Sequence, residues 1–269
     1  MKAEDLRAAL TSGTPRHIHL IGVAGSGMSG IAALLLGLGH HVSGSDKVDT
    51  IEVDRLQKKG LRFHTPHSAE CVSDAEIVLY SSAIKAGNPA FDEAVRLGIP
   101  MARRADSLAA MMASRKGIIV CGMHGKTTTS AMAAHVLRGG GLKPSHYVGA
   151  EIPILGTNAR WDSEGEYFVA EGDESDGTLI NYHPHHAIVL NIEAEHLDFY
   201  KDLNAIDAVY SKLVSQTSGN IFYCADDEGA RRVCSNAPRS ISYGQSKIRS
   251  EERRVGKECR IGCRSRWSP

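Results

Sequence analysis

A glycine-rich loop at residues 122–129, here called the phosphate loop, carries the clearest chemical pattern in this sequence of 269 residues. It reads GMHGKTTT and lies between an apolar segment, 118–121, and a helical pattern. In this context backbone N–H groups cradle phosphates, Lys126 neutralises their charge, and the Thr127 hydroxyl can bind Mg²⁺. The usual spacing would need a glycine where Val120 stands, and a lone GKT also occurs by chance. The strand before the loop and the helix after it favour phosphate binding.

Two acidic segments follow later predicted strands. Residues 171–176 read EGDESD, and four carboxylates so close together repel one another unless cations or solvent screen them. At the carboxyl end of a parallel strand beside a phosphate loop, Mg²⁺ is the expected cation, and a solvated acidic turn is the simpler alternative. Residues 191–198 read NIEAEHLD and place His196 among acids. A neutral imidazole there would complete a second metal site or touch the terminal phosphate, whereas His196 taken alone would be an ordinary surface histidine.

An earlier glycine-rich segment, residues 22–30, is here called the first glycine turn, and it follows the apolar segment 17–22. Read as G-x-G-x-x-G over 25–30, it fits a dinucleotide-binding pattern, and Asp46 lies 21 residues after the first of these glycines. Glycines let the backbone approach a diphosphate, and the following helix offers free N–H groups. Glycines at such a turn also serve packing in sheets that bind nothing. The pattern therefore predicts a diphosphate-bearing ligand but does not specify which one.

Two groups of histidines lack further partners at metal-ligand spacing. His183, His185 and His186 lie in a proline turn, and His17 and His19 alternate onto one face of a predicted strand. We interpret both groups as structural.

The chain as a whole alternates short apolar segments with helical patterns, which predicts a parallel α/β fold. Predicted strands cover 17–22, 41–45, 61–64, 76–81, 99–102, 118–121, 147–149, 167–170, 187–191 and 221–224. Predicted helices cover 28–38, 52–59, 89–97, 106–113, 127–138 and 203–215. After a polar break at 114–117 the pattern of strand, glycine loop and helix starts again. The predicted fold class is α/β, with a Rossmann-like N-terminal domain at 1–114 and a partial P-loop-type α/β central domain at 115–246.

Charge and hydropathy exclude several classes of protein. Lys and Arg total 31, as do Asp and Glu, so no overall basic field favours nucleic acid or an anionic membrane. The longest apolar run, 31–38, is well below the roughly 18–20 residues of a spanning helix, and the N-terminus lacks an apolar signal core. Six scattered cysteines without a CxxC pair are typical of a reduced compartment. These features predict a cytoplasmic protein with no nucleic-acid or membrane partner.

Residues 247–269 differ from the rest of the chain. They carry eight basic and three acidic side chains, almost no apolar periodicity, and two cysteines four residues apart. A basic interaction tail and a metal-binding segment are two interpretations. Because the segment interrupts the alternation of strands and helices and resembles translated cloning or sequencing sequence, we interpret it as non-native and exclude it from the predicted fold.

Six motifs together make the sequence similar to the Mur ligases, the ATP-dependent amino-acid ligases of peptidoglycan precursor synthesis. In the family's order and spacing they are GVAGSGMSGIA at 22–32, SGSD at 43–46, SSAI at 81–84, GMHGKTTT at 122–129, EGDESD at 171–176 and NIEAEHLD at 191–198. Met123 stands where the family usually has threonine, and Gly172 where alanine is commoner, and both changes leave the phosphate chemistry possible. Several motifs matching together are more specific than either glycine loop alone.

The resemblance implies a role for each motif. The phosphate loop would bind ATP through Gly122, Met123, His124, Gly125, Lys126, Thr127 and Thr128. Thr127 and Glu171 would hold one Mg²⁺ and His196 a second, and Lys126, Glu171 and His196 would be the catalytic residues. The first glycine turn would bind the diphosphate of a UDP-sugar rather than that of NAD. The implied substrate-binding residues are Gly22, Gly25, Ser26, Gly27, Met28, Ser29, Asp46, His67, Ser82, Ala83 and Asn158.

The implied reaction joins L-alanine to UDP-N-acetylmuramate through an acyl phosphate made with ATP. The spellings SSAI and DESD favour L-alanine over a preformed murein tripeptide, which another member of the family attaches. An NAD-dependent dehydrogenase would leave the phosphate loop unexplained, and a UDP-sugar-binding protein without catalysis is a further alternative. The family has a third domain that the sequence lacks, so we expect this chain alone to be a poor ligase. No feature of the sequence specifies whether the protein is a monomer or an oligomer.

Overall fold

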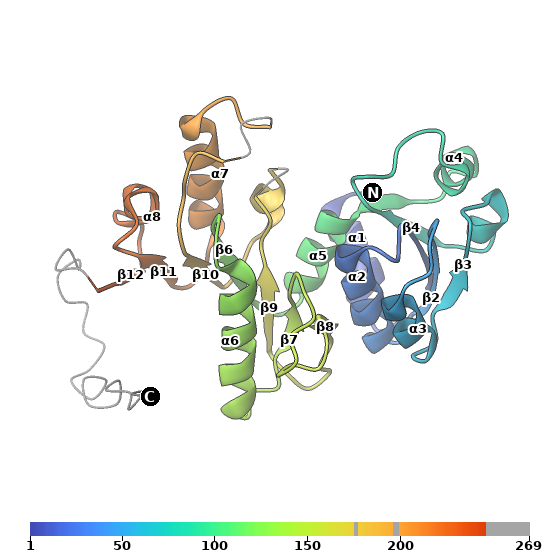
Figure 1. The fold of residues 1–269 in the computed structure, drawn as a ribbon, viewed down its shortest axis with the longest axis horizontal. Helices are drawn as coiled ribbons and strands as arrows, with labels where there is room; N and C mark the ends of the chain where they lie inside the picture. The colour runs from blue at the N-terminus through green and yellow to red at the C-terminus, as the bar shows by residue number, and fades with distance from the viewer. Residues whose placement is uncertain (175–176, 196–198, 246–269) are drawn as a thin grey trace.

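Two mainly parallel β-sheets form the framework of the computed structural model, which describes residues 1–174, 177–195 and 199–245 (Figure 1). The first sheet has the order β3-β2-β1-β4-β5, and all its strands are parallel. These strands are β1 (His17–Ile21), β2 (His41–Ser45), β3 (Arg62–His64), β4 (Ile77–Tyr80) and β5 (Met101–Arg103). The helices of this part are α1 (Ala3–Thr11), α2 (Ser26–Gly37), α3 (Ile51–Gln57), the 3-10 helix η1 (Ala69–Val72), α4 (Pro89–Arg96) and α5 (Arg104–Met112).

The second sheet has the order β12-β11-β10-β6-β9-β7-β8 and is parallel except where β8 pairs with β7. Its strands are β6 (Lys116–Cys121), β7 (Ser145–Tyr147), β8 (Ala159–Arg160), β9 (Tyr167–Glu171), β10 (His186–Val189), β11 (Ile221–Cys224) and β12 (Ser240–Tyr243). The helices of this part are α6 (Lys126–Gly139), the 3-10 helix η2 (Thr178–Asn181), α7 (Leu203–Gln216) and α8 (Glu228–Cys234).

The middle strand of each sheet leads into a glycine loop. All five residues of β1 and five of the six residues of β6 are buried, as expected for apolar strands covered by helices on both faces. The backbone beyond each strand turns through a left-handed glycine, with φ of 88° at Gly22 and 138° at Gly122. A Cβ at Gly122 would lie 2.9 Å from the backbone nitrogen of Asn191. Both turns therefore require glycine at their first position.

The predicted α/β class is confirmed, and the differences lie in short elements. The prediction of a strand at 147–149 is wrong by two residues, since β7 ends at Tyr147. The sequence patterns did not reveal α1, α8, β8 or β12, nor the 3-10 helices η1 and η2. In α1, Leu6 and Leu10 are buried four residues apart, but the helix is only nine residues long and mostly charged or small. β8 has two residues, too few to carry a periodic pattern.

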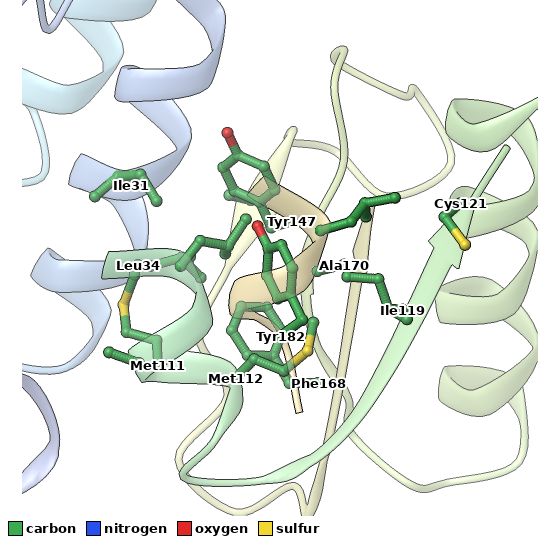
Figure 2. Packing of buried hydrophobic residues seen from close by; sticks show 14 of the residues in the cluster. Ile31, Leu34, Met111, Met112, Ile119, Cys121, Tyr147, Phe168, Ala170 and Tyr182 are labelled. Carbon is green, nitrogen blue, oxygen red and sulfur yellow. The ribbon is translucent and has the colours of Figure 1, made fainter. Parts of the chain in front are cut away.

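One hydrophobic core joins the two sheets. Ile31 and Leu34 of α2 belong to the same buried cluster as Phe168 of β9 and Tyr182, which follows η2. Figure 2 shows side chains of this cluster from both parts of the chain, with Ile31 and Leu34 from α2, Met112 from α5, and Phe168 and Tyr182 from the second part. Helices of the first part thus cover apolar residues of the second sheet, and burial of this shared surface holds the two glycine loops in one frame.

The predicted division at residue 114 falls between α5 and β6, where the chain passes from the first sheet to the second. Residues 247–269 lie outside the described residues, so their interpretation as non-native stays a prediction. Within the described ranges, no helix has the length and apolar character needed to cross a membrane.

Candidate active site

The phosphate loop connects β6 directly to α6. Gly125 precedes the helix with a left-handed φ of 84°, and Lys126 is its first residue. The first N–H groups of a helix have no partner within the helix and carry the positive end of its dipole, so this position favours an anion. The side chain of Met123 is 6% exposed and belongs to the core, whereas Thr128 is exposed in the first turn of α6. Met123 therefore contributes only its backbone groups to the surface of the phosphate loop.

Lys126 folds back onto the loop that precedes it. Its Nζ donates to the carbonyl oxygens of Gly122 at 2.6 Å and Met123 at 3.1 Å, and to Oε1 of Glu174 at 2.7 Å. The side chains of Lys126 and Glu174 are 17% and 2% exposed. Burial raises the pKa of the Glu174 carboxyl, while the hydrogen bond from Lys126 acts in the opposite direction. A cation is thus held at the start of α6, where phosphate oxygens would meet it.

Thr127 and Glu171 meet at the carboxyl ends of β6 and β9. The parallel register sets Val120 opposite Glu171, and the Thr127 hydroxyl lies 3.0 and 3.1 Å from the two carboxylate oxygens of Glu171. Gly149 donates its backbone N–H to the same carboxylate at 2.7 Å. A hydroxyl and a carboxylate beside a phosphate site are the oxygen ligands that Mg²⁺ uses, with substrate oxygens and water completing its shell. The donor set therefore fits Mg²⁺.

His196, the other predicted metal ligand, lies outside the described residues. Among the residues that the structure describes, no three His, Cys, Asp or Glu side chains converge as a metal cluster. Nearby, Nε2 of His124 lies 3.4 Å from Oε1 of Glu195. The segment that contains His196 thus begins next to the phosphate loop.

Asn191 is a site residue that the sequence analysis did not single out. Its side-chain oxygen accepts the backbone N–H of His124 at 2.8 Å, and its side-chain nitrogen donates to the carbonyl of His124 at 3.0 Å. Its own backbone carbonyl accepts from Met123. Asn191 thus fixes the phosphate loop from the end of β10. The sequence clues are its place at the start of the NIEAEHLD motif and a polar residue directly after an apolar strand.

The first glycine turn is held from the neighbouring strand. The carbonyl of Ser45 accepts the backbone N–H of Gly22 at 2.8 Å, and Oδ2 of Asp46 accepts that of Ala24 at 2.9 Å. The other oxygen of Asp46 accepts the N–H of Lys47 at 2.7 Å. Asp46 therefore shapes the turn itself, and its implied role as a substrate-binding residue stays a prediction.

Two glycines of this turn face protein. A Cβ at Gly30 would lie 2.8 Å from Cε2 of Tyr147, and a Cβ at Gly27 would lie 2.9 Å from Cδ of Arg104. Tyr147 also donates its hydroxyl to the carbonyl of Gly27 at 3.0 Å and accepts from Arg104 at 3.1 Å. The packing explanation for the glycine pattern therefore holds at Gly27 and Gly30, where β7 and α5 come close to α2.

The remaining predicted substrate residues differ in exposure. Met28 and Ser29 are buried within α2. Asn158 is 8% exposed, and its side-chain nitrogen donates to the carbonyl of Ser26 at 3.2 Å. Ser82 and Ala83 are exposed in the turn after β4, and His67 is half-buried with its Nδ1 2.9 Å from the hydroxyl of Ser45. All of them lie at or near the carboxyl ends of β1, β2 and β4, the edge where ligands of such sheets bind.

The framework of two glycine loops, a lysine at a helix start and a carboxylate on the adjoining strand fits a nucleotide-binding α/β protein, and comparison with known families gives its class. Residues 17–116 match the family described as "Mur ligase family, catalytic domain", and residues 120–259 match "Mur ligase middle domain". The chain belongs to the Mur ligase family, whose members are ATP-dependent ligases that form C–N bonds.

Individual relatives carry more specific names. The UDP-N-acetylmuramate–L-alanine ligase of Pelotomaculum thermopropionicum is 42% identical over 83% of this chain and 49% of its own length. That of Rubrobacter xylanophilus is 42% identical over 85% of this chain and 52% of its own. The crystal structure of the UDP-N-acetylmuramate–alanine ligase of Thermotoga maritima superposes with a TM-score of 0.78 at 27% identity, over 86% of this chain and 53% of that one. The chain spans about half the length of the curated relatives it matches.

A murein-peptide-adding relative is equally similar in structure. The UDP-N-acetylmuramate:L-alanyl-γ-D-glutamyl-meso-diaminopimelate ligase from Neisseria meningitides gives a TM-score of 0.77 at 26% identity, over 86% of this chain and 78% of that one. Overall structure therefore does not discriminate between the two kinds of added group.

Proposed function

We propose that this chain forms the nucleotide-binding part of a ligase that uses ATP to join L-alanine to UDP-N-acetylmuramate. The observation that carries the proposal is the meeting of Lys126, Thr127 and Glu171 at one edge of the second sheet. The names of the relatives at 42% identity support the choice of L-alanine. The free cysteines among the described residues, Cys71, Cys121, Cys224 and Cys234, support a cytoplasmic location.

In this proposal the phosphate loop binds the triphosphate of ATP. Lys126 would exchange a carbonyl or carboxylate partner for phosphate oxygens, and the N–H groups at the start of α6 would donate hydrogen bonds to other phosphate oxygens. Thr127 and Glu171 would hold one Mg²⁺, and His196 would hold a second. These ions, when bound, would neutralise phosphate charge.

The first glycine turn binds the UDP-sugar. Gly22 and Gly25 let the backbone approach the diphosphate, and Ser26 opens α2 with free N–H groups toward it. Asp46, His67, Ser82 and Ala83 would lie toward the uridine end. Asn158 would act from the second part of the chain, next to Ser26.

The chemistry is carboxylate activation. The γ-phosphoryl group of ATP passes to the muramoyl carboxylate and ADP leaves. The amine of L-alanine attacks the carbonyl carbon of the acyl phosphate and loses a proton, and the tetrahedral intermediate expels inorganic phosphate to give the amide. Carboxylate and triphosphate repel each other, so the charge of Lys126 must reduce that repulsion for the two to approach. The chain contributes position and positive charge and needs no covalent enzyme intermediate.

Calorimetric titration of the purified chain tests the proposal with three ligands: UDP-N-acetylmuramate, ATP with Mg²⁺, and NADH. We expect the first two to bind and NADH to fail. Binding of NADH without UDP-N-acetylmuramate would restore the dehydrogenase interpretation, and binding of the UDP-sugar without ATP would leave a non-catalytic binder. For the longer protein, ADP should form only when UDP-N-acetylmuramate and L-alanine are both present.

A further inference from the structure

Five polar side chains form a continuous hydrogen-bonded chain inside the first sheet, which we call the histidine relay. Its members, in order, are His17, Ser43, His19, Ser45 and His67. His17 and His19 come from β1, Ser43 and Ser45 from β2, and His67 follows β3. The successive nitrogen-to-oxygen distances are 2.8, 2.8, 3.0 and 2.9 Å. His19, Ser43 and Ser45 are fully buried, so the relay is a polar path through the interior.

The proton on His17 is fixed from both sides of its ring. Nδ1 lies 2.7 Å from the carbonyl oxygen of Asp74, which can only accept, so Nδ1 carries the proton. Nε2 lies 2.7 Å from Nη2 of Arg62, which can only donate, so Nε2 is unprotonated. Arg62 is held in turn by the Asp74 carboxylate at 3.1 Å. Ser43 therefore cannot accept from His17, and the Ser43 hydroxyl, 2.8 Å away, shares the one lone pair of Nε2 with Arg62 as a second donor.

The order set at His17 passes along the relay, because each hydroxyl has one proton and each neutral imidazole has one N–H. Ser43 donates to His17 and so accepts from Nδ1–H of His19. Burial and the neighbouring histidines lower the pKa of His19 to about 3, so the ring is neutral and its Nε2 accepts from Ser45. Ser45 then accepts from Nδ1–H of His67, whose pKa is lowered by burial. Nε2 of His67 is left as an acceptor.

We propose that the histidine relay fixes His67 as a hydrogen-bond acceptor for a donor group on the nucleoside of the ligand at the first glycine turn. This inference rests on the proposed function, in which a UDP-sugar binds there. His67 is hydrogen-bonded to the side chain of Ser45, and the backbone carbonyl of Ser45 accepts the N–H of Gly22. Ser45 thus connects the His67 ring to the first glycine turn. A uridine offers an imide N–H and ribose hydroxyls as donors. The opposite tautomer of His67 would set N–H against N–H and select against the imide.

The tautomers are measured directly by long-range ¹H–¹⁵N correlation spectra of the histidine rings in the purified, ¹⁵N-labelled chain at pH 7.5. His67→Gln identifies the His67 signals. We expect the proton on Nδ1 in His17, His19 and His67 alike. A proton on Nε2 of His67 overturns the relay, and the tautomer itself is read in the parent chain.

Removing a hydroxyl of the relay far from the ligand tests whether the arrangement of protons set at His17 reaches His67. Ser43→Ala removes a hydroxyl that is separated from His67 by two relay members, His19 and Ser45. We expect His67 to lose its single tautomer and the affinity for UDP to fall about tenfold, which is about 1.4 kcal/mol. Ser107→Ala is the matched control, because Ser107 is equally buried but donates to the Arg104 carbonyl outside the relay. A folded Ser43→Ala variant with the parent tautomer and the parent affinity contradicts the inference.

Two analogues separate the possible donors. Loss of affinity for 3-methyl-UDP assigns the imide N–H to His67, and loss for 2′-deoxy-UDP assigns a ribose hydroxyl. Undiminished binding of both overturns the acceptor role. If the parent chain binds no UDP at all while His67 carries its proton on Nδ1, the proposed function and the ligand contact both fail, whereas the relay itself stands.

Discussion

The ammonium group of Lys126 lies 2.7 Å from the carboxylate of Glu174, and the two side chains are among the least exposed charges beside the phosphate loop. The pair gives the lysine a counter-ion when no phosphate is bound. The same carboxylate adds negative charge next to the place where a triphosphate would bind. Stabilising the loop and admitting ATP are therefore opposing demands on Glu174.

Glu174→Gln tests this opposition. The amide keeps an acceptor for Lys126 but removes the negative charge, so we expect the affinity for ATP to rise about threefold to tenfold by titration calorimetry. Glu166→Gln is the control, because Glu166 also pairs with a lysine, Lys116, but lies at the amino-terminal end of β9, away from the loop. Unchanged or weaker ATP binding in Glu174→Gln would show that the carboxylate does not oppose the nucleotide.

Thr127→Val tests the Mg²⁺ site. Valine keeps the shape of threonine but loses the hydroxyl that lies 3.0 Å from Glu171, so we expect the Mg²⁺-dependent part of ATP affinity to fall about tenfold or more. Thr127→Ser, which keeps the hydroxyl, should stay near the parent value. The measurement is ATP affinity with Mg²⁺ and with EDTA. A valine variant with full Mg²⁺ dependence would exclude Thr127 as a ligand.

Asn191→Ala removes both hydrogen bonds that hold His124. Because the backbone groups of His124 lose their partners, we expect the free energy of unfolding to fall by about 1–2 kcal/mol. We also expect ATP to bind more weakly. Asn191→Asp keeps an acceptor for the N–H of His124 and should fall between parent and alanine variant. Urea unfolding and nucleotide titration measure the two effects. If ATP affinity is unchanged while stability falls, Asn191 supports the fold without shaping the phosphate site.

Gly30→Ala tests the packing role of the first glycine turn. The new Cβ would lie 2.8 Å from a ring carbon of Tyr147, so we expect the free energy of unfolding, measured with urea, to fall by about 1–3 kcal/mol. Gly139→Ala is the control: it is also helical, and a Cβ there has nothing within 4 Å. The control should be neutral or slightly more stable. Equal stabilities for the two variants would mean that α2 and β7 do not pack as described.

Acid should destabilise the chain partly through His19. Burial, the largest cause, lowers the pKa of His19 from 6.5 to about 3. Between these pH values His19 is protonated in the unfolded chain but not in the folded chain. The contribution of neutral His19 to the free energy of unfolding is therefore complete above pH 6.5 and is lost as the pH falls toward 3. The slope reaches at most about 1.4 kcal/mol per pH unit. His19→Asn should flatten the dependence of unfolding free energy on pH, and an exposed control, His41→Asn, should not.

Much of the framework was predictable because it is encoded locally. Apolar strands that end in glycine and run into helical patterns identified both β1 with α2 and β6 with α6. The elements that were missed are those in which local sequence is weak, such as the two residues of β8, which exist because β7 offers an antiparallel partner. The boundary of β7 was wrong because no alternation fixes three residues.

The sequence by itself determined the fold class, the two glycine loops and the family, because these depend on residues close together in the chain. The tertiary structure decided which distant side chains meet. It brought Glu174 to Lys126 and set Asn191 against the phosphate loop. It also gave the geometry of Thr127 beside Glu171, a pair that the family resemblance had implied. Such pairings follow from strand register and from the face on which each side chain lies, and a pattern read along one chain contains neither.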